Sequence, residues 1–127
     1  MGVDSEPAAV ATATRNAARL KLPTAQFLSL TAAELARFLS AARYRPDVVI
    51  LDPPRTGARS LIEPLARMRP RQVIYVSCDV ATFARDLRAL RERGYEVSAI
   101  HGFDFFPNTH HAEVVAHAVL TSARGRS

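Results

Sequence analysis

The sequence predicts a layered α/β fold, because hydrophobic runs typical of buried strands alternate with helical segments. The clearest runs lie in Asp47–Asp52 and Gln72–Ser77, and their continuous apolar character is typical of strands buried on both faces of a parallel sheet. With 127 residues, 48% of them hydrophobic, the chain has room for one domain and one modest core. We expect residues 1–121 to form that domain and residues 122–127 to form a flexible tail.

The first elements are expected to be short. Gly2–Asp4 is typical of the end of a strand, and Ser5 or Asp4 can cap the helix that we expect at Ala8–Leu20. A second short strand is expected at Ala25–Leu28, so the pattern begins as strand, helix, strand.

Two later helices begin with the spacing of a capping box, in which Ser or Thr is followed three residues later by Glu. Thr31 and Glu34 form the first such pair, and Ser60 and Glu63 form the second, whose helix should end near Met68. The remaining expected elements are a helix at Ala81–Arg93, capped by Asp79 and ended by Gly94, and strands at Tyr95–Ile100 and Glu113–Leu120.

The overall charge permits RNA binding but does not establish it. The chain has 17 Lys and Arg against 12 Asp and Glu, for a net charge of +5, and Lys21 is its single lysine. Arginine matches phosphate geometry, although a preference for Arg over Lys also follows from genome composition. No apolar run approaches the roughly 20 residues of a membrane span, and no signal peptide is visible, so we expect a cytoplasmic protein.

Several chemically interesting residues are expected at one edge of the sheet. In open α/β sheets, ligands bind at the carboxyl ends of the strands. By that rule Asp4, Asp52, Cys78 and the loop at 101–112 should face the same edge, which makes that edge the candidate site.

Cys78 is the single cysteine, so it cannot form a disulfide within the chain. A lone cysteine is commonly a small buried hydrophobic residue. Cys78, however, lies between an expected strand and an expected helix, and the N–H groups and dipole of a helix N-terminus favour thiolate. The neighbouring Asp79 opposes this effect, so both interpretations stay open on local chemistry alone.

The segment Asp52-Pro53-Pro54-Arg55 is expected to be a stiff loop at a strand end, although a plain turn has the same composition. Amino-group methyltransferases that act on adenine carry a similar loop with an aromatic residue in fourth place, which stacks on a flipped base. Arg55 stands there instead, which weakens that alternative.

Two further features concern the expected loop before the last strand. Glu113 lies where that loop enters the strand, so its carboxylate could reach the candidate site or could simply be a solvated acid. The adjacent residues His110 and His111 do not indicate a metal, because neighbours on an extended segment point in opposite directions and there is no second ligand cluster.

Three ordered motifs can be compared with known families. They are Val48–Arg55, Ile74–Asp79 together with Ala81–Leu87, and Asp104–Pro107 together with Thr109, His111 and Glu113. In combination they resemble the catalytic C-terminal part of the RNA (uracil-5)-methyltransferase family, which modifies uridines in tRNA and rRNA. The resemblance extends from Gly2 to about Leu120.

The resemblance implies an S-adenosylmethionine-dependent enzyme that methylates C5 of a uridine in RNA. It implies that Cys78 is the nucleophile and that Glu113 is the general base. It also implies that Asp4 binds the ribose of the cofactor, that Asp52 lies at the edge shared by cofactor and substrate, and that Thr31 lies near the adenine. Residues on the substrate side would be Pro53, Pro54, Arg55, Pro107, Thr109 and His111.

The sequence departs from the family in a few places. Val80 replaces the usual Pro, Asn108 replaces His, and Thr31 replaces an acidic or amide residue. The implied fold is a Rossmann-like class I methyltransferase sheet that lacks its first strand and its Gly-rich cofactor loop, which the family has before the position of Met1. A catalytically inactive remnant or interaction module of the same fold is therefore the alternative function.

Overall fold

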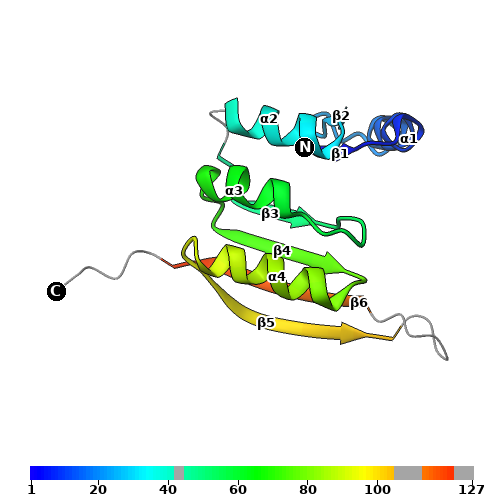
Figure 1. The fold of residues 1–127 in the computed structure, drawn as a ribbon. Helices are drawn as coiled ribbons and strands as arrows, with labels where there is room; N and C mark the ends of the chain where they lie inside the picture. The colour runs from blue at the N-terminus through cyan, green and yellow to red at the C-terminus, as the bar shows by residue number, and fades with distance from the viewer. Residues whose placement is uncertain (42–44, 105–112, 122–127) are drawn as a thin grey trace. The chain divides into compact units, whose positions relative to one another are not determined.

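The computed structural model describes residues 1–41, 45–104 and 113–121 of the chain (Figure 1). The expected tail at 122–127 lies outside the described residues. The chain divides into two compact units, Met1–Ala42 and Arg43–Ser127, which we call unit 1 and unit 2. Both units combine strands with helices, so the predicted α/β class is confirmed.

Unit 1 contains a two-stranded parallel sheet and two helices. Strand β1 (Gly2–Asp4) pairs with β2 (Phe27–Ser29), and helix α1 (Pro7–Arg19) connects them. Helix α2 (Ala32–Ala41) follows β2. The second strand therefore begins two residues later than the sequence indicated.

The start of α1 differs from the expectation that Ser5 or Asp4 would cap it. Glu6 is the N-cap residue, and its carboxylate accepts a hydrogen bond of 3.2 Å from the Ala8 N–H. Asp4 instead accepts from the Glu6 N–H at 2.8 Å. Asp4 is the last residue of β1 and lies two residues before the N-cap, so its side chain stabilises the turn that leads into the helix.

The capping box of α2 is confirmed. The Thr31 hydroxyl accepts from the Glu34 N–H at 3.3 Å, and the Glu34 carboxylate accepts from the Thr31 N–H at 2.8 Å. The pKa of Glu34 is lowered, mainly because its carboxylate also accepts a hydrogen bond from the Thr31 hydroxyl.

Unit 2 contains a four-stranded sheet with the order β3-β4-β6-β5. Strand β3 runs parallel to β4, whereas β6 is antiparallel to both of its neighbours. The elements of this unit are β3 (Val48–Leu51), α3 (Arg59–Met68), β4 (Gln72–Ser77), α4 (Val80–Arg91), β5 (Tyr95–Phe103) and β6 (Glu113–Leu120).

Helices α3 and α4 cover one face of this sheet (Figure 1). Val73 and Tyr75 point from β4 toward the helices and are fully buried, as is Leu90 of α4. The opposite face is different: Val48 and Ile50 of β3 are 46% and 68% exposed. The expectation that β3 is buried on both faces is therefore wrong for this structure, because the described helices of unit 2 lie on one face.

The start of α3 also differs from the expectation. Its N-cap residue is Ala58, which provides no side-chain hydrogen bond, so Ser60 and Glu63 do not form a capping box. Glu63 instead pairs with Arg67 at 3.1 Å and with Arg93 at 2.6 Å. These two ion pairs engage both oxygen atoms of the Glu63 carboxylate.

Candidate functional site at the carboxyl ends of β3 and β4

Two of the predicted site residues follow neighbouring parallel strands. Asp52 comes directly after β3, and Cys78 comes directly after β4. Leu51, the last residue of β3, pairs with Tyr75. Since parallel strands end at the same edge of a sheet, the segments that follow β3 and β4 lie side by side. Asp52 is exposed and Cys78 is partly buried.

The third catalytic candidate reaches the same edge from the opposite direction. Strand β6 is antiparallel to β4, and its second residue, Val114, pairs with Ser77. Glu113 precedes Val114 and Cys78 follows Ser77, so both residues adjoin the last pair of the β4–β6 ladder. Glu113 also pairs with Phe103 of β5, and it is partly buried.

The turn around Cys78 is held by its two neighbours. The Ser77 hydroxyl accepts a hydrogen bond of 3.1 Å from the Asp79 N–H. Asp79 is the N-cap of α4, as predicted, and its carboxylate accepts from the Thr82 N–H at 2.8 Å. This backbone hydrogen bond is the main reason why the pKa of Asp79 is lowered. Cys78 therefore lies one residue before a well-formed helix cap.

The segment from Asp52 to Ala58, which we call the proline loop, passes from β3 to α3. The Pro54 carbonyl accepts from the Gly57 N–H at 2.8 Å, which closes a tight turn. Gly57 has a φ of +78°, in the left-handed region that favours glycine. A Cβ atom there would lie 2.5 Å from both the Arg85 Nη2 and the Asp86 Oδ2 atoms, so only glycine fits.

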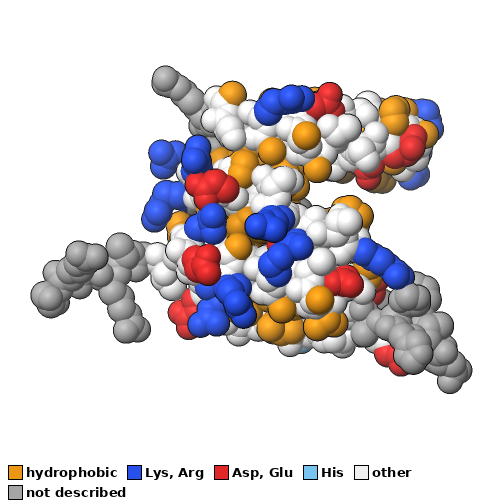
Figure 2. All heavy atoms as spheres, viewed as in Figure 1, with side chains coloured by type: hydrophobic (Ala, Val, Ile, Leu, Met, Phe, Trp, Pro, Cys, Tyr) orange, Lys and Arg blue, Asp and Glu red, His pale blue; other side chains and the backbone are white. Residues whose placement is uncertain are grey.

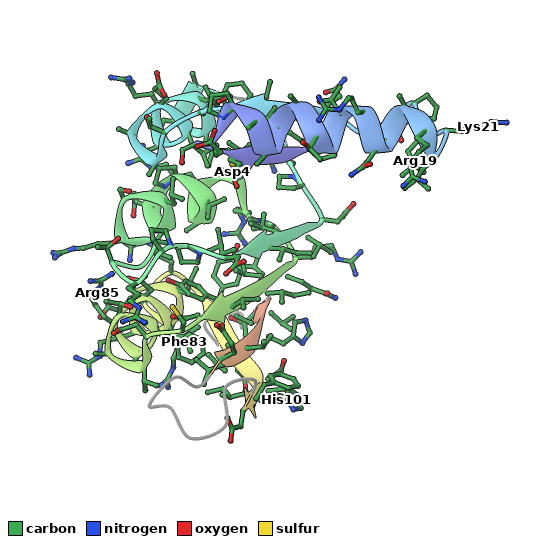
Figure 3. All side chains as sticks on the ribbon, turned by 90° about the vertical axis from the view of Figure 1, so that its right-hand side faces the viewer. Asp4, Arg19, Lys21, Phe83, Arg85 and His101 are labelled. Atoms are coloured by element: carbon green, nitrogen blue, oxygen red, sulfur yellow. The ribbon has the colours of Figure 1, made fainter. Side chains whose placement is uncertain are left out.

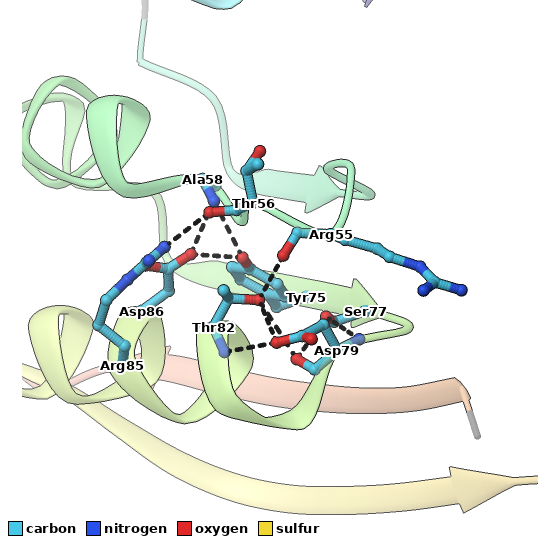
Figure 4. A network of polar contacts seen from close by, with 9 residues as sticks. All are labelled: Arg55, Thr56, Ala58, Tyr75, Ser77, Asp79, Thr82, Arg85 and Asp86. Carbon is cyan, nitrogen blue, oxygen red and sulfur yellow. Dashed lines mark hydrogen bonds and ion pairs between the residues drawn. The ribbon is translucent and has the colours of Figure 1, made fainter. Parts of the chain in front are cut away.

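Three residues of α4 bind the backbone of the proline loop, as Figure 4 shows. The Thr82 hydroxyl donates to the Arg55 carbonyl at 2.9 Å, and the Arg85 guanidinium donates to the Thr56 carbonyl at 3.0 Å. The Asp86 carboxylate accepts from the Ala58 N–H at 2.7 Å. We call Thr82, Arg85 and Asp86 the helix–loop clamp.

The clamp has a buried centre. Asp86 has no exposed surface, and its Oδ2 atom also accepts from the Tyr75 hydroxyl at 2.6 Å. Its Oδ1 atom lies 2.8 Å from the Arg85 Nη2 atom. Burial, followed by the hydrogen bond to Asp86, raises the pKa of Tyr75. A buried carboxylate with these partners is satisfied, whereas the same carboxylate without them would be strongly destabilising.

The two predicted cofactor residues in the first part of the chain belong to unit 1. Asp4 is exposed at the end of β1, beside the start of α1 (Figure 3). Thr31 is exposed as well, and its hydroxyl donates to Glu34 at 2.7 Å within the capping box. This local partner gives Thr31 a structural role, while its contact with adenine stays a prediction.

Pro107, Thr109 and His111 lie outside the described residues, as do His110 and Asn108. Among the residues that are described, no group of three or more His, Cys, Asp and Glu side chains could hold a metal ion. No helix in the described part of the chain is long and apolar enough to cross a membrane.

The charged surface of unit 2 is mixed in sign. Figure 2 shows basic side chains, which in unit 2 are arginines, gathered over α3 and α4, with acidic side chains among them. Glu63 has a lowered pKa, chiefly because of its hydrogen bond with Arg93 and then that with Arg67. Part of the positive charge is therefore paired, and the surface by itself does not identify a polyanionic ligand.

Comparisons with known proteins identify the family. Residues 8–121 match the tRNA (uracil-5-)-methyltransferase family. The chain is 37% identical to an RNA methyltransferase of Caldanaerobacter subterraneus and 39% identical to one of Streptococcus mutans, in each case over 91% of its length. It covers 25% and 26% of these two proteins, so it spans about a quarter of the length of the relatives that it matches.

Solved structures agree with this relationship. The chain is 35% identical to the tRNA (uracil-54, C5)-methyltransferase of Pyrococcus abyssi, which was solved in complex with S-adenosyl-L-homocysteine. The TM-score is 0.76, with 93% of this chain and 27% of that chain covered. An rRNA methylase of Streptococcus thermophilus, at 12% identity and a TM-score of 0.67 over 94% of this chain and 72% of that one, shares the fold alone. The chain therefore has a methyltransferase fold and belongs to the tRNA (uracil-5-)-methyltransferase family.

Proposed function

We propose that this chain is the catalytic part of an enzyme that transfers a methyl group from S-adenosylmethionine to C5 of a uridine in tRNA or rRNA, with Cys78 as nucleophile and Glu113 as general base. The observation that supports this most strongly is the register of β4 and β6. Its last pair, Ser77 and Val114, adjoins both the single cysteine and Glu113, in a chain that belongs to a uracil-5-methyltransferase family.

The chemistry explains why these two residue types are needed. C5 of uracil is a weak nucleophile. A thiolate that adds to C6 moves the electrons of the C5–C6 double bond onto C5, which can then accept a methyl group. A base must next remove the proton of C5, so that the double bond forms again and the sulfur leaves as thiolate. Cys78 would perform the first step, and Glu113 would perform the second.

The residues of the chain are chemically suited to the cofactor. S-adenosylmethionine supplies an electrophilic methyl group on a sulfonium. Asp4 presents an exposed carboxylate at a strand end, and a carboxylate accepts hydrogen bonds from ribose hydroxyls. Asp52 presents a second exposed carboxylate at the end of β3. Asp4 would hold the ribose, and Asp52 would face both the cofactor and the substrate.

RNA as the substrate is supported by the relatives. The Pyrococcus abyssi protein acts on uracil 54 of tRNA, and the bacterial relatives are RNA methyltransferases. Arg55 follows Pro53 and Pro54 in the proline loop and is exposed, which suits a residue that meets RNA phosphates. Pro107, Thr109 and His111 would complete the substrate side.

The experiment uses RNA labelled with tritium at C5 of uridine, because methylation at C5 releases that tritium into water whereas methylation at any other atom does not. We expect Cys78→Ala to abolish release. Glu113→Gln should block release but accumulate a covalent RNA adduct that survives denaturing electrophoresis. Glu96→Gln, which removes an exposed acid from β5 of the same sheet, is the matched control. Undiminished release by Cys78→Ala would overturn the proposal.

The alternatives predicted from the sequence have distinct outcomes in related assays. An amino-group methyltransferase would methylate RNA without releasing tritium and would not need Cys78. An inactive remnant would not bind S-adenosylmethionine, so stoichiometric binding in a calorimetric titration of this chain would exclude that alternative.

A further inference from the structure

We propose that the helix–loop clamp, Thr82, Arg85 and Asp86, consists of positioning residues that fix the proline loop relative to Cys78 for the methyl-transfer reaction. This inference rests on the proposed function, because it assigns the clamp to the same reaction. The supporting observation is that three side chains of α4 bind backbone groups of the proline loop, which lies 27 or more residues away in the sequence.

The spacing of the clamp residues matches the spacing of the groups that they bind. Arg85 and Asp86 follow Thr82 by three and four positions, so both are neighbours of Thr82 on the helix surface. Their partners are the carbonyl groups of Arg55 and Thr56 and the N–H of Ala58. Because the contacts are to backbone groups, they determine where the loop lies without restricting its side chains.

The hydrogen bonds of the clamp are made with backbone groups of the loop. In Figure 4 the Arg55 carbonyl faces Thr82, whereas the Arg55 side chain extends away from the clamp. Pro53 and Pro54 precede this point and restrict the backbone further, because each proline fixes φ. The side chains of the loop are thereby presented from a backbone that is held in place.

The same helix determines the position of Cys78. Asp79 caps α4, and the Thr82 hydroxyl lies 2.9 Å from the Asp79 carboxylate and 2.9 Å from the Arg55 carbonyl. Thr82 therefore contacts both the turn that follows Cys78 and the proline loop. A nucleophile and a substrate-binding loop that share one rigid helix keep their separation, and errors of about 1 Å in such a separation can cost roughly 100-fold in rate.

Gly57 and Tyr75 both lie in close contact with the residues of the clamp. Gly57 lies between two of the clamped groups, and a Cβ atom there would collide with Arg85 and Asp86. Tyr75 donates to the buried Asp86 carboxylate from β4, the strand that leads to Cys78. The clamp is therefore anchored to the sheet on one side and to the proline loop on the other.

The test compares Thr82→Val and Arg85→Gln with wild type in the full chain. Arg88→Gln is the matched control, because it removes an exposed arginine from the same helix outside the clamp. The first readout is hydrogen exchange of the amides of residues 55–58. We expect these amides to exchange about tenfold faster in both clamp variants, because each variant loses one hydrogen bond that holds the loop closed. Exchange in the control should be unchanged.

The second readout is the tritium-release assay. We expect kcat to fall about 10- to 100-fold in both variants while KM for RNA changes less than about twofold, since the clamp orients the reacting groups and binds no RNA. Thr82→Ser, which restores the hydroxyl, should recover most of kcat. A loss of kcat that only follows the folded fraction, measured by circular dichroism at the assay temperature, would overturn the positioning role.

The two proposals can fail separately. Unchanged exchange of the loop amides in both variants overturns the clamp, whatever the activity of the chain. Undiminished tritium release by Cys78→Ala overturns the assignment of the nucleophile, and with it the role of the clamp in that reaction, even if loop exchange responds as expected. Asp86→Asn is not used, because it would place an amide at a fully buried position and could unfold the chain. The variants at Thr82 and Arg85 avoid this problem.

Discussion

Unit 1 and unit 2 follow the same alternation of strands and helices but are stabilised in different ways. In unit 1 the strands have three residues each, and Ala17 and Leu39 are the buried apolar side chains among its described residues. In unit 2 the sheet has four strands, both helices contribute several buried side chains, and a buried carboxylate joins α4 to the proline loop. Packing therefore determines the structure of unit 2, whereas caps and turns contribute relatively more in unit 1.

The catalytic candidates follow this difference. Cys78, Glu113 and Asp52 belong to unit 2, where tertiary contacts hold the segments that carry them. Asp4, the proposed ribose ligand, belongs to unit 1 and is held by a local hydrogen bond to the Glu6 N–H. We infer that residues that must be positioned to a fraction of an ångström lie on the better-packed unit.

The largest expected difference between the units concerns core truncation. Leu90→Ala should lower the free energy of unfolding by about 2–5 kcal/mol, because Leu90 is fully buried and its truncation removes apolar contacts and creates a cavity. Leu39→Ala should have a smaller effect, since nearby Phe38 is 40% exposed and its surroundings can relax. Urea unfolding followed by circular dichroism measures both changes, and equal losses would contradict the contrast between the units.

A second prediction concerns the phenol that joins the sheet to the clamp. Tyr75→Phe should destabilise the chain by about 1–3 kcal/mol, because it leaves a buried carboxylate with one donor fewer. Tyr95→Phe, which removes a hydroxyl that donates to the neutral Pro70 carbonyl, is the matched control and should cost less.

The same phenol predicts a loss of stability at alkaline pH. The pKa of Tyr75 is raised in the folded state, so its contribution is complete below the ordinary value of 10.0 and is lost as pH rises from there through the folded pKa. The urea midpoint of wild type should therefore fall above about pH 10, and Tyr75→Phe should fall less. Burial also raises the pKa of Tyr95, so part of the loss should remain in that variant. An identical decline in both proteins would exclude Tyr75 as a source.

A smaller effect is expected from one capping carboxyl group in each unit. The carboxyl groups of Asp79 in unit 2 and Glu34 in unit 1 both have lowered pKa values because they accept hydrogen bonds at a helix start. Their contributions are present above the ordinary values of 3.8 and 4.5 and are lost as pH falls through the folded pKa. Hydrogen exchange of the first turns of α4 and α2 should therefore accelerate on acidification.

Variants separate the cap from other effects of acid. Asp79→Asn keeps an acceptor that does not titrate, so the first turn of α4 should lose its acid sensitivity while the first turn of α2 keeps it. Glu34→Gln should produce the reverse pattern. Acid sensitivity that persists at α4 in Asp79→Asn would mean that another group is responsible.

The smallest effect is expected at the surface of unit 2. Glu63 pairs with Arg67 and Arg93, but all three side chains are at least one-third exposed, so water and salt screen the attraction. Glu63→Gln should change the melting temperature by less than about 2 °C, and less still in high salt. A larger shift in a calorimetric scan would show that the outer face of α3 contributes to stability.

Much of the candidate site could be predicted from local patterns. The apolar runs located β3 and β4, the Asp79 cap located the start of α4, and together they placed Cys78 between a strand and a helix. Glu113 could be singled out as an acid that begins the last strand, and its predicted role as base comes from the family resemblance. These features depend on neighbours in the sequence, where propensity and capping operate.

Other features were missed or misjudged because they depend on contacts between distant segments. Ser60 and Glu63 have the spacing of a capping box, but Glu63 pairs with Arg93, 30 residues away, and α3 begins at Arg59 without a side-chain cap. Asp86 was overlooked because an acid within a helix of charged residues is commonly solvated. The glycine at position 57 is a sequence signal for a close approach, and the structure shows that it makes room for Arg85 and Asp86 against the proline loop.

The sequence by itself determined the α/β class, most strand and helix positions, and the resemblance that identified the family, because these depend on periodicity, capping and ordered motifs. Only the tertiary structure decided that Val114, which follows Glu113, pairs with Ser77, which precedes Cys78, and that Asp86 is buried and bound to the proline loop. The physical reason is that strand register and the satisfaction of a buried charge are set by partners far apart along the chain.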